Sequence, residues 1–524
     1  MYVQRIIKKV KNRTYSTVLL VESYRDGGKV KHRTVLNLSK WEKQQVDALD
    51  ASLKGNYLSS LDDLETKAGK SIGGIWVFKQ LADQLGITKV LGKGKEALFA
   101  LLLIIGRIIT QGSRLHLCQW GRGQELEDVL GIKKYDENHL YATLDWLSIN
   151  QEDIEDALFK SRYNDKPPRL FLYDVTSSYL EGQQNELAAY GYNRDGKKAK
   201  KQIVIGLLTD DNGIPVAVRV FKGNTSDTST VCEQVKKLSN RFGVKNITLV
   251  GDRGMIKNVQ IEHLSLYGFD YITAITKVQI KTLLKDGVFQ IDLFDDKLME
   301  IEYEGVRYVL RKNPHRVEEL KNSKMSKYEK IKAKSEELSK YLKEHPKAKV
   351  ETVLKTLNEL TATLSIKDWV DIKENERNIV VSIDDEKLKE NSILDGCYAI
   401  KTNLTKEDIT ADKIHERYKD LSLVEHAFKI MKTEQLEVRP VYVRKKSRTV
   451  GHVFVTMLAY ILTHEFDKRT SNLSMTTEYM VDVLDKIQTI EISLAGKTVK
   501  RIPTPGEDAQ TTLNALDIKL PLNV

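Results

Sequence analysis

The sequence RLFLYDVTSSY, residues 169–179, is the stretch around which the chain is organised. Apolar and aromatic residues lie on both sides of a single acid, Asp174; two prolines precede them and three hydroxyl residues follow. A short, β-favouring run with such borders is typical of a buried strand. A carboxylate inside a buried strand costs free energy unless a cation, a hydrogen bond or a metal compensates for it. Taken alone, Asp174 is best explained as a salt-bridged or strand-end residue, because most buried acids are paired.

Outward from this strand, the residues as far as 275 alternate between strand and helix patterns. Strands are predicted at 203–208, 215–221, 247–250 and 271–275, and a helix at 229–242. Asp252 directly follows the strand at 247–250, in the turn GDRGM. In α/β proteins a carboxylate just past a strand end, beside a glycine-flanked turn, commonly takes part in the chemistry. The pattern therefore predicts an α/β core with Asp174 and Asp252 near its site.

A third acid, Glu425, lies on a predicted long helix over 405–432. Apolar residues at spacings of three and four form a stripe along this helix. Tyr418, Glu425 and Lys432 are spaced by seven residues, which is about two helical turns, so they share one side. Glu425 therefore lies at the margin of the buried face, which makes a purely solvated glutamate a weaker explanation than usual.

Five cations occupy ten residues after this helix, at 439–448. A basic turn at the end of a helix is a suitable surface for DNA phosphates. Arg439, Arg444 and Lys445 are the predicted phosphate contacts here, and Arg253 is another, beside Asp252. A solvated basic loop remains the alternative interpretation of this charge.

Composition changes along the chain predict six segments. They are a small basic β unit (1–60), a helical domain that is a candidate for DNA binding (61–162), the first part of the core (163–277), a β-rich insertion carrying a helical hairpin (278–394), the second part of the core (395–470) and a polar tail (471–524). A chain of 524 residues is too long for a single core, so several domains are expected.

The composition bounds the function classes. A hydrophobic fraction of 41% with 30% charged residues describes a soluble globular protein, and the net charge of +10 suits a polyanionic partner. The three cysteines are far apart, which excludes a disulfide framework and a CxxC zinc site and favours a reducing cytosol. We find no signal peptide and no apolar run long enough to span a membrane, so no membrane partner is expected.

Three carboxylates without a histidine or cysteine cluster suit a hard, oxygen-seeking ion such as Mg²⁺, for which Mn²⁺ can substitute. Two such ions can activate an attacking oxygen and stabilise a leaving one in phosphodiester chemistry. Asp174, Asp252 and Glu425 are the predicted catalytic and metal-binding residues. Because the chain contains 73 acids, spacing alone is a weak signal for any three of them, and their context carries the prediction.

The ordered motifs resemble the transposases of bacterial insertion sequences. They are YDVTSSYLEG, GYNRDG with Gln202, GNTSD, GDRGM, the Tyr418–Glu425–Lys432 spacing, RPVYVR and GHVFV. The most similar group is the insertion-sequence-four type, in its sixteen-thirty-four branch. The resemblance covers about 170–275 and 395–465 well, and the remainder in layout only.

This resemblance implies a mixed-sheet α/β core that is ribonuclease-H-like, with Asp174, Asp252 and Glu425 as a DDE triad and a β-rich insertion before the glutamate. The wider group carries an arginine where this chain has Leu421, which leaves Arg417 or Arg439 as substitutes. In similar enzymes a tryptophan of the insertion stacks on a base flipped out of the DNA. Trp369 is the candidate here, although packing in a core is the commoner fate of tryptophan.

The function expected from this resemblance is DNA transposition. The protein would bind the terminal inverted repeats, cut a phosphodiester by metal-activated water and join the 3′-OH to target DNA, as a homodimer when two ends are paired. Tyr418, Lys432 and Arg439 would contact DNA, in the cytoplasm and at the bacterial nucleoid. Two alternatives remain open, namely a ribonuclease-H-like nuclease without strand transfer and a non-catalytic DNA-binding protein derived from a transposase.

Overall fold

The computed structural model describes residues 1–10, 13–55, 64–164, 166–182, 184–197, 199–231, 234, 247–439, 441–494 and 497–521. It divides into two compact units. The first comprises residues 1–80, 119–133 and 469–524, and the second comprises 81–118 and 134–468. Most of the helix predicted at 229–242 lies outside the described residues.

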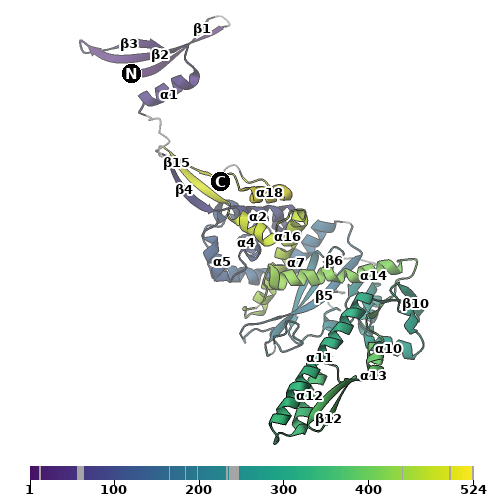
Figure 1. The fold of residues 1–524 in the computed structure, drawn as a ribbon. Helices are drawn as coiled ribbons and strands as arrows, with labels where there is room; N and C mark the ends of the chain where they lie inside the picture. Colours follow the sequence, from purple (N-terminus) through teal and green to yellow (C-terminus); the bar gives the residue numbers. More distant parts are fainter. Residues whose placement is uncertain are drawn as a thin grey trace. The chain divides into compact units, whose positions relative to one another are not determined.

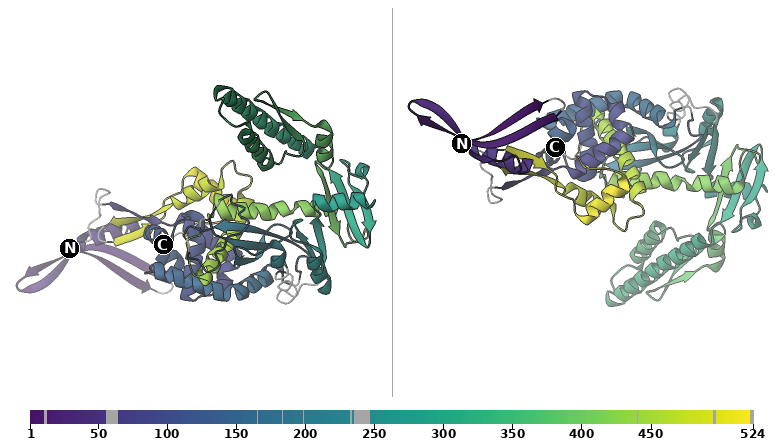
Figure 2. Two further views of the ribbon diagram at one scale, coloured as in Figure 1. Left: turned by 90° about the horizontal axis from the view of Figure 1, so that it is seen from below. Right: turned by 90° about the horizontal axis from the view of Figure 1, so that it is seen from above.

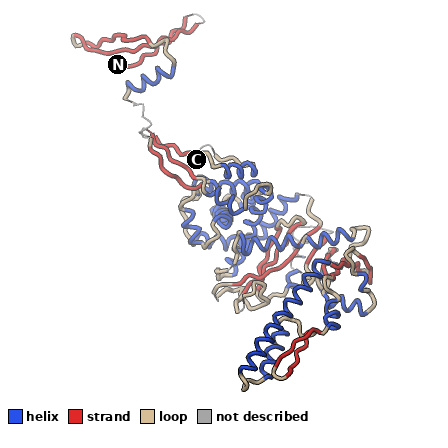
Figure 3. Tube along the Cα trace, in the orientation of Figure 1, coloured by secondary structure: helices blue, strands red, loops and turns tan. Residues whose placement is uncertain are grey.

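The second unit is built on an eight-stranded mixed sheet (Figures 1 and 3). Its strands, in spatial order, are β10 (Met299–Tyr303), β11 (Val306–Lys312), β14 (Cys397–Thr402), β9 (Asp270–Ala274), β8 (Thr248–Gly251), β5 (Leu170–Tyr179), β6 (Gln202–Asp210) and β7 (Pro215–Lys222). β5, β8 and β9 run parallel, whereas β5, β6 and β7 are antiparallel. β6 is buried at every position, and its apolar run over 203–208 is typical of a central strand. The predicted mixed α/β core is confirmed.

The register of β5 and β8 determines where the two aspartates lie. β8 ends at Gly251, which pairs with Tyr173 of β5. The next residues on the two parallel strands are Asp174 and Asp252. β5 continues past this point, because its other edge stays paired with β6 as far as Tyr179. Asp174 is therefore in the middle of its own strand but beside the end of its neighbour, and strands lie about 4.8 Å apart.

The helix predicted over 405–432 consists of three consecutive pieces. They are α14 (Ala411–Lys419), α15 (Leu421–Lys429) and a π-helical turn, Ile430–Glu434. Thr410 caps the first piece by accepting a hydrogen bond from the backbone of Lys413. α15 packs against β5 and β6. Single π-turns of this kind are frequent at functional sites, and Lys432 lies within this one.

The predicted β-rich character of the insertion is wrong. β10 and β11 belong to the main sheet, because β11 pairs with β14. The remainder is mostly helical: α11 (Pro314–Glu344) has 31 residues and α12 (Val350–Thr363) has 14. Figure 2 shows them side by side as a hairpin. A two-stranded sheet of β12 (Val370–Asn375) and β13 (Asn378–Ile383) packs with them, and α13 (Asp385–Ser392) follows.

Helices complete the second unit. They are α3 (Ile87–Leu91), α4 (Lys95–Ile109), α7 (Glu137–Tyr163), α9 (Asn258–Leu266), α10 (Lys277–Lys285) and most of α16 (Lys446–Thr470). α4 packs against α7, and residues 453–462 of α16 are all buried. Gly451 allows α16 to approach α7 closely, because a Cβ there would lie 2.2 Å from the carbonyl oxygen of Leu144.

The first unit contains two small sheets. β1 (Tyr2–Val10), β2 (Arg13–Asp26) and β3 (Lys29–Asn37) form an antiparallel sheet next to α1 (Lys43–Leu53), at the place where the sequence predicts a β unit. β4 (Glu65–Ser71), β15 (Gln488–Leu494) and β16 (Lys497–Arg501) form the other. Helices α2 (Gly73–Gln84), α5 (Arg114–Gly121), α6 (Leu126–Leu130), α17 (Thr477–Asp485) and α18 (Glu507–Leu516) lie wholly or partly in this unit. The described residues of this C-terminal segment, 471–494 and 497–521, therefore form strands and helices of this unit rather than a tail.

Among the described residues, no single helix has the length and apolar character needed to cross a membrane, and one bent pair, α4 with α5, meets those criteria only jointly.

Candidate active site

Three acids from separate parts of the chain line one cavity of about 420 Å³. Asp174 comes from β5, Asp252 from the turn after β8 and Glu425 from α15. Asp174 is partly buried, whereas Asp252 and Glu425 are exposed to solvent. The structure thus brings together all three predicted catalytic residues.

The electrostatics of Asp174 reflect this clustering. Burial is the main reason that its pKa is raised to about 7. The charges of Asp252 and Glu425 act in the same direction, whereas the guanidinium of Arg194 lowers the pKa. A cation bound beside Asp174 would favour its charged form and oppose both the burial and the neighbouring negative charges.

Tyr418 positions the second aspartate. Its hydroxyl donates to Oδ1 of Asp252 over 3.2 Å. Burial first, and then the charge of Asp252, raise the pKa of this phenol, so it remains a donor at neutral pH. Asp252 also accepts a hydrogen bond of 2.7 Å from the backbone N–H of Arg253. The Tyr418 hydroxyl and the Arg253 N–H therefore hold the Asp252 carboxylate at the start of the turn that follows β8.

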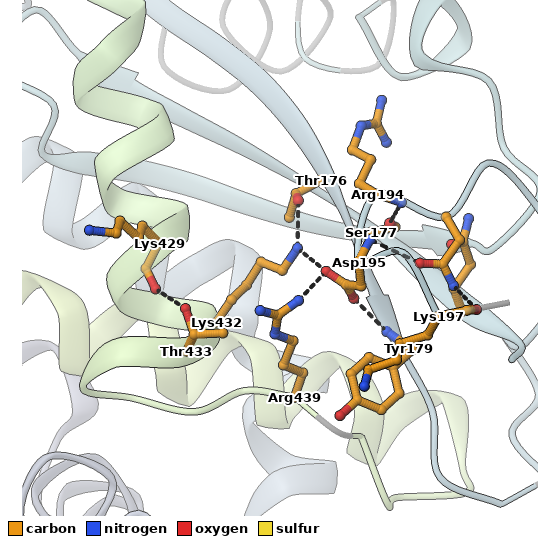
Figure 4. Close-up of polar contacts among 12 residues, drawn as sticks. Thr176, Ser177, Tyr179, Arg194, Asp195, Lys197, Lys429, Lys432, Thr433 and Arg439 are labelled. Carbon is orange, nitrogen blue, oxygen red and sulfur yellow. Dashed lines mark hydrogen bonds and ion pairs between the residues drawn. The ribbon is translucent and has the colours of Figure 1, made fainter. Parts of the chain in front are cut away.

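A buried acid that the sequence analysis did not assign, Asp195, holds two of the predicted DNA-contacting cations (Figure 4). Its side chain is 1% exposed. Nζ of Lys432 donates to Oδ1 of Asp195 over 2.6 Å and to Oγ1 of Thr176 over 3.0 Å. Arg439 donates to the same carboxylate oxygen. All four of these side chains line the cavity of the three acids.

The loop that carries Asp195 is fixed to the end of β5. Oδ2 of Asp195 accepts from the backbone N–H of Tyr179 over 3.1 Å, and Ser177 accepts from the backbone of Arg194 over 3.0 Å. The Arg194 side chain pairs with Asp227 at 2.6 Å. Residues of the motifs GYNRDG and GNTSD therefore line the cavity together with the three acids. The sequence marks Asp195 only as an acid inside a basic, glycine-rich loop. Its role could not be predicted, because its cationic partners are far away in sequence.

Comparison with protein families gives two matches that cover the site and the N-terminal sheet. A family described as "Transposase DDE domain" matches residues 165–462. The family described as "IS1634 family transposase, N-terminal domain" matches residues 3–67. The first match covers more than half of the chain and includes all three acids. The chain belongs to the IS1634-type DDE transposases.

Solved structures similar to this transposase are distant. A piggyBac transposase synaptic complex with hairpin DNA matches with a TM-score of 0.37 and 9% identity, over 75% of this chain and 70% of that one. A Mos1 transposase paired-end complex with the left transposon end matches with a TM-score of 0.15 and 10% identity, over 34% and 58%. Comparison with curated proteins gives no match.

The donor set of the transposase cavity fits a hard divalent cation. Among the described residues that line it, the acids supply only oxygen donors, and none is histidine or cysteine. Such donors match Mg²⁺ and Mn²⁺. In the described part of the chain, no three acidic, histidine or cysteine side chains already converge to metal-binding distance. The three carboxylates therefore share a cavity without forming a closed coordination shell.

Arg417 and Arg439, the two candidates to replace the arginine that the wider group carries at the position of Leu421, differ in position. Leu421 is buried. Arg417 pairs with Asp420 at 2.9 Å, and it is not among the residues that line the cavity. Arg439 does line the cavity. Of the two candidates, the geometry favours Arg439.

The other predicted DNA contacts lie outside the cavity. Arg253, Arg444 and Lys445 are exposed, and no ion pair to any of them is found among the described residues. Trp369 is 1% exposed and packs with Ile331, Ile366 and Val370 of the insertion. This packing presents no open ring face to a nucleotide, so a core role explains Trp369 better than base stacking.

Proposed function

We propose that this transposase binds the terminal inverted repeats of its element, cuts a phosphodiester bond at each end and joins the freed 3′-OH to target DNA. The observation that carries the proposal is the meeting of Asp174, Asp252 and Glu425 in one cavity within the family-matched region. The antiparallel β5–β6–β7 order followed by the parallel β8 and β9 supports a ribonuclease-H-like core.

Asp174, Asp252 and Glu425 would hold two Mg²⁺ ions, or Mn²⁺ in their place. When bound, such ions lower the pKa of a water nucleophile and neutralise charge on the phosphate oxygens. The protein's own residues prepare this cavity. Tyr418 fixes Asp252 by a hydrogen bond, and Asp195 fixes the positive ends of Lys432 and Arg439 within the same cavity, where they would contact a bound phosphate.

Arg444 and Lys445 would contact the duplex beyond the cavity. They lie on a loop that is docked against the chain after β5: Asn185 donates to the carbonyl oxygen of Val443 over 2.6 Å, and the backbone of Glu186 donates to that of Arg444. A positioned loop with exposed, unpaired cations is suited to sequence-independent phosphate contacts. Pairing of two element ends would require two copies of the chain, so a homodimer is proposed in the DNA-bound state.

The experiment that tests this function is cleavage of a labelled duplex carrying the terminal repeat that flanks the coding sequence. Wild type and Asp252→Asn are compared with Mg²⁺ and with EDTA. We expect cutting at the element boundary that requires both Mg²⁺ and Asp252, and joined products when target DNA is added. Cutting without joining would instead identify a nuclease, and tight binding without cutting would identify a DNA-binding protein.

A further inference from the structure

None of the roles proposed above uses the motif GHVFV, residues 451–455 near the start of α16. Gly451 is explained by the close approach of α16 to α7, and the three apolar residues of the motif are buried. His452 is only 6% exposed as well. Because a buried polar side chain costs free energy unless it is hydrogen-bonded, the contacts of His452 indicate what it does.

His452 links a buried arginine at the start of α5 to the loop that follows the π-turn. A terminal nitrogen of the Arg114 guanidinium lies 2.8 Å from Nδ1 of His452. Nε2 of His452 lies 3.3 Å from the carbonyl oxygen of Val438. All three residues are buried and belong to the second unit. Val438 directly precedes Arg439, so the imidazole contacts the backbone beside a proposed phosphate contact.

The two partners of His452 determine where its proton lies. A guanidinium has only donors, so Nδ1 must accept, and a carbonyl oxygen only accepts, so Nε2 must carry the hydrogen. Burial first, and then the charges of Arg114 and Arg107, lower the pKa of His452 well below its usual value. The imidazole therefore stays neutral, in the Nε2–H form that makes both contacts.

The backbone is held on both sides of Arg439. Before it, the N–H of Val438 donates to the carbonyl oxygen of Met431 in the π-turn over 2.9 Å, and the carbonyl oxygen of Val438 accepts from the imidazole. After it, the N–H of Val441 donates to the carbonyl oxygen of Tyr179, at the end of β5, over 3.2 Å. The Arg439 side chain, which lines the cavity of the three acids, therefore starts from a fixed position.

We propose that His452 is a positioning residue for Arg439: its hydrogen bond to the Val438 carbonyl directs the Arg439 guanidinium into the cavity, where it contacts a DNA phosphate. His452 is buried, so it acts only through Arg439. Arg114 acts one step further away, because it keeps the donor side of the imidazole turned toward Val438. The proposal rests on the DNA-cutting function proposed above and on Arg439 as one of its phosphate contacts.

The test separates the two hydrogen bonds of His452 with two uncharged substitutions in the full-length protein. In His452→Gln, the amide nitrogen reaches about as far as Nε2 and can still donate to Val438. In His452→Asn, the shorter amide keeps an acceptor for Arg114 but loses the donor to Val438. With the terminal-repeat duplex and Mg²⁺, His452→Gln should cut at nearly the wild-type rate. His452→Asn should cut about 10- to 100-fold more slowly, since a misplacement of about 1 Å can cause such a loss.

A double-mutant cycle with Arg439→Ala distinguishes positioning from a general loss of stability. Once Arg439 is alanine, the guanidinium that His452 positions is absent. His452→Asn should then slow cleavage by less than about 2-fold. Residues that act independently would instead show the same slowing in both backgrounds, because their free energies add.

Thr463→Val is the matched control on the same helix. Thr463 is also buried and hydrogen-bonded, but its hydroxyl donates to the carbonyl oxygen of Ala459 within α16 and makes no contact with the loop of Arg439. This variant should lower the melting temperature and leave the rate of cleavage by the folded protein unchanged. If His452→Asn does not fold, Arg114→Met/His452→Leu replaces it. This pair removes the same donor without leaving a buried arginine unpaired, and should show the same slowing and the same dependence on Arg439.

The outcomes separate this proposal from the function on which it rests. Equal slowing by His452→Asn in the two backgrounds, or equal rates for His452→Asn and His452→Gln, would overturn the positioning role while the cutting function stands. An unchanged rate in Arg439→Ala would overturn it as well, because there would be no phosphate contact to position. If wild type does not cut the duplex, both proposals fail.

Discussion

At the scale of single residues, the site depends on one buried acid shared by two cations. Lys432 and Arg439 both bind Asp195, so the single negative charge of Asp195 compensates part of their positive charge inside the protein. Burial lowers the pKa of Lys432, and Asp195 raises it, which helps to keep the ammonium charged. Removing one partner of a buried ion pair is strongly destabilising because it leaves the other charge buried and uncompensated.

We therefore expect Asp195→Asn to lower the free energy of unfolding by about 3 kcal/mol, measured by urea denaturation. The double variant Asp195→Asn/Lys432→Met removes one of the orphaned charges and should recover part of this loss without recovering cleavage. The matched control is Asp482→Asn, which breaks the exposed pair with Lys486 and should cost less than about 1 kcal/mol. Equal losses for Asp195→Asn and Asp482→Asn would contradict a buried role for Asp195.

A second residue-scale prediction concerns Asp174. Its pKa is raised from 3.8 to about 7 in the folded chain, so in this pH interval the folded protein retains a proton that the unfolded chain releases. The carboxyl group therefore costs stability progressively as pH rises from about 4 to 7, and the whole cost is present above pH 7. Asp174→Asn, which carries no charge, should raise the melting temperature in EDTA at pH 8, and less at pH 5.

Mg²⁺ provides the control for this prediction, followed by differential scanning fluorimetry. Mg²⁺ at pH 8 should stabilise wild type by binding the folded state, and it should have little effect on Asp174→Asn. A lower melting temperature of Asp174→Asn in EDTA at pH 8 would show that the carboxylate is stabilised by contacts other than those described.

The residues that sequence reasoning found share one property. Asp174 and Asp252 interrupt or end apolar strand patterns, and Glu425 lies in a repeating helical spacing, so each is conspicuous locally. Asp195 is not, because its partners Lys432 and Arg439 lie 237 and 244 residues away and only the folded sheet brings them to it. Gln202 was noticed as part of a motif, but its fixed amide orientation depends on two backbone carbonyls in separate loops.

At the scale of elements, the register of the strands determines where the two aspartates lie. Asp174 is placed for chemistry because β8 is short and stops beside Tyr173, while β5 continues along β6. β5 was predictable from its apolar run, but the position along β5 at which β8 ends was not. The insertion was misjudged for a related reason, since the alternating pattern of β10 and β11 fits any hairpin and does not reveal that it extends the main sheet through β14.

Helix packing gives an element-scale prediction. Gly451 lets α16 lie against α7, and a Cβ there would be 2.2 Å from the backbone oxygen of Leu144. Backbone cannot yield as a flexible side chain can, so Gly451→Ala should lower the free energy of unfolding by about 1–3 kcal/mol. Gly94→Ala, at the start of α4, would meet only the end of the Glu96 side chain at 3.5 Å and should change stability little. A change for Gly451→Ala as small as that for Gly94→Ala would show that α16 and α7 can move apart at little cost.

At the scale of the whole molecule, charge determines how the transposase would meet DNA. The formal net charge is +10 from 83 basic and 73 acidic residues, a modest surplus, so the location of unpaired cations matters more than their total. Three lysines of α11 and α12 pair with glutamates one turn away, namely Lys334 with Glu337, Lys340 with Glu344 and Lys355 with Glu359. Arg444 and Lys445, in contrast, are exposed and have no ion pair within the described residues.

This difference predicts a measurable change in salt dependence. Each phosphate contact contributes about −0.9 to the slope of log K against log salt concentration for duplex DNA. If Arg444 and Lys445 each neutralise one phosphate, the variant Arg444→Ala/Lys445→Ala should reduce the magnitude of that slope by about 1.8, and should weaken binding to terminal-repeat and unrelated duplexes equally, as measured by fluorescence anisotropy. Lys334→Ala/Lys340→Ala removes the same charge from helix ion pairs and should leave the slope nearly unchanged. A larger effect of Lys334→Ala/Lys340→Ala would show that the duplex contacts the helical hairpin of the insertion rather than the loop that carries Arg444 and Lys445.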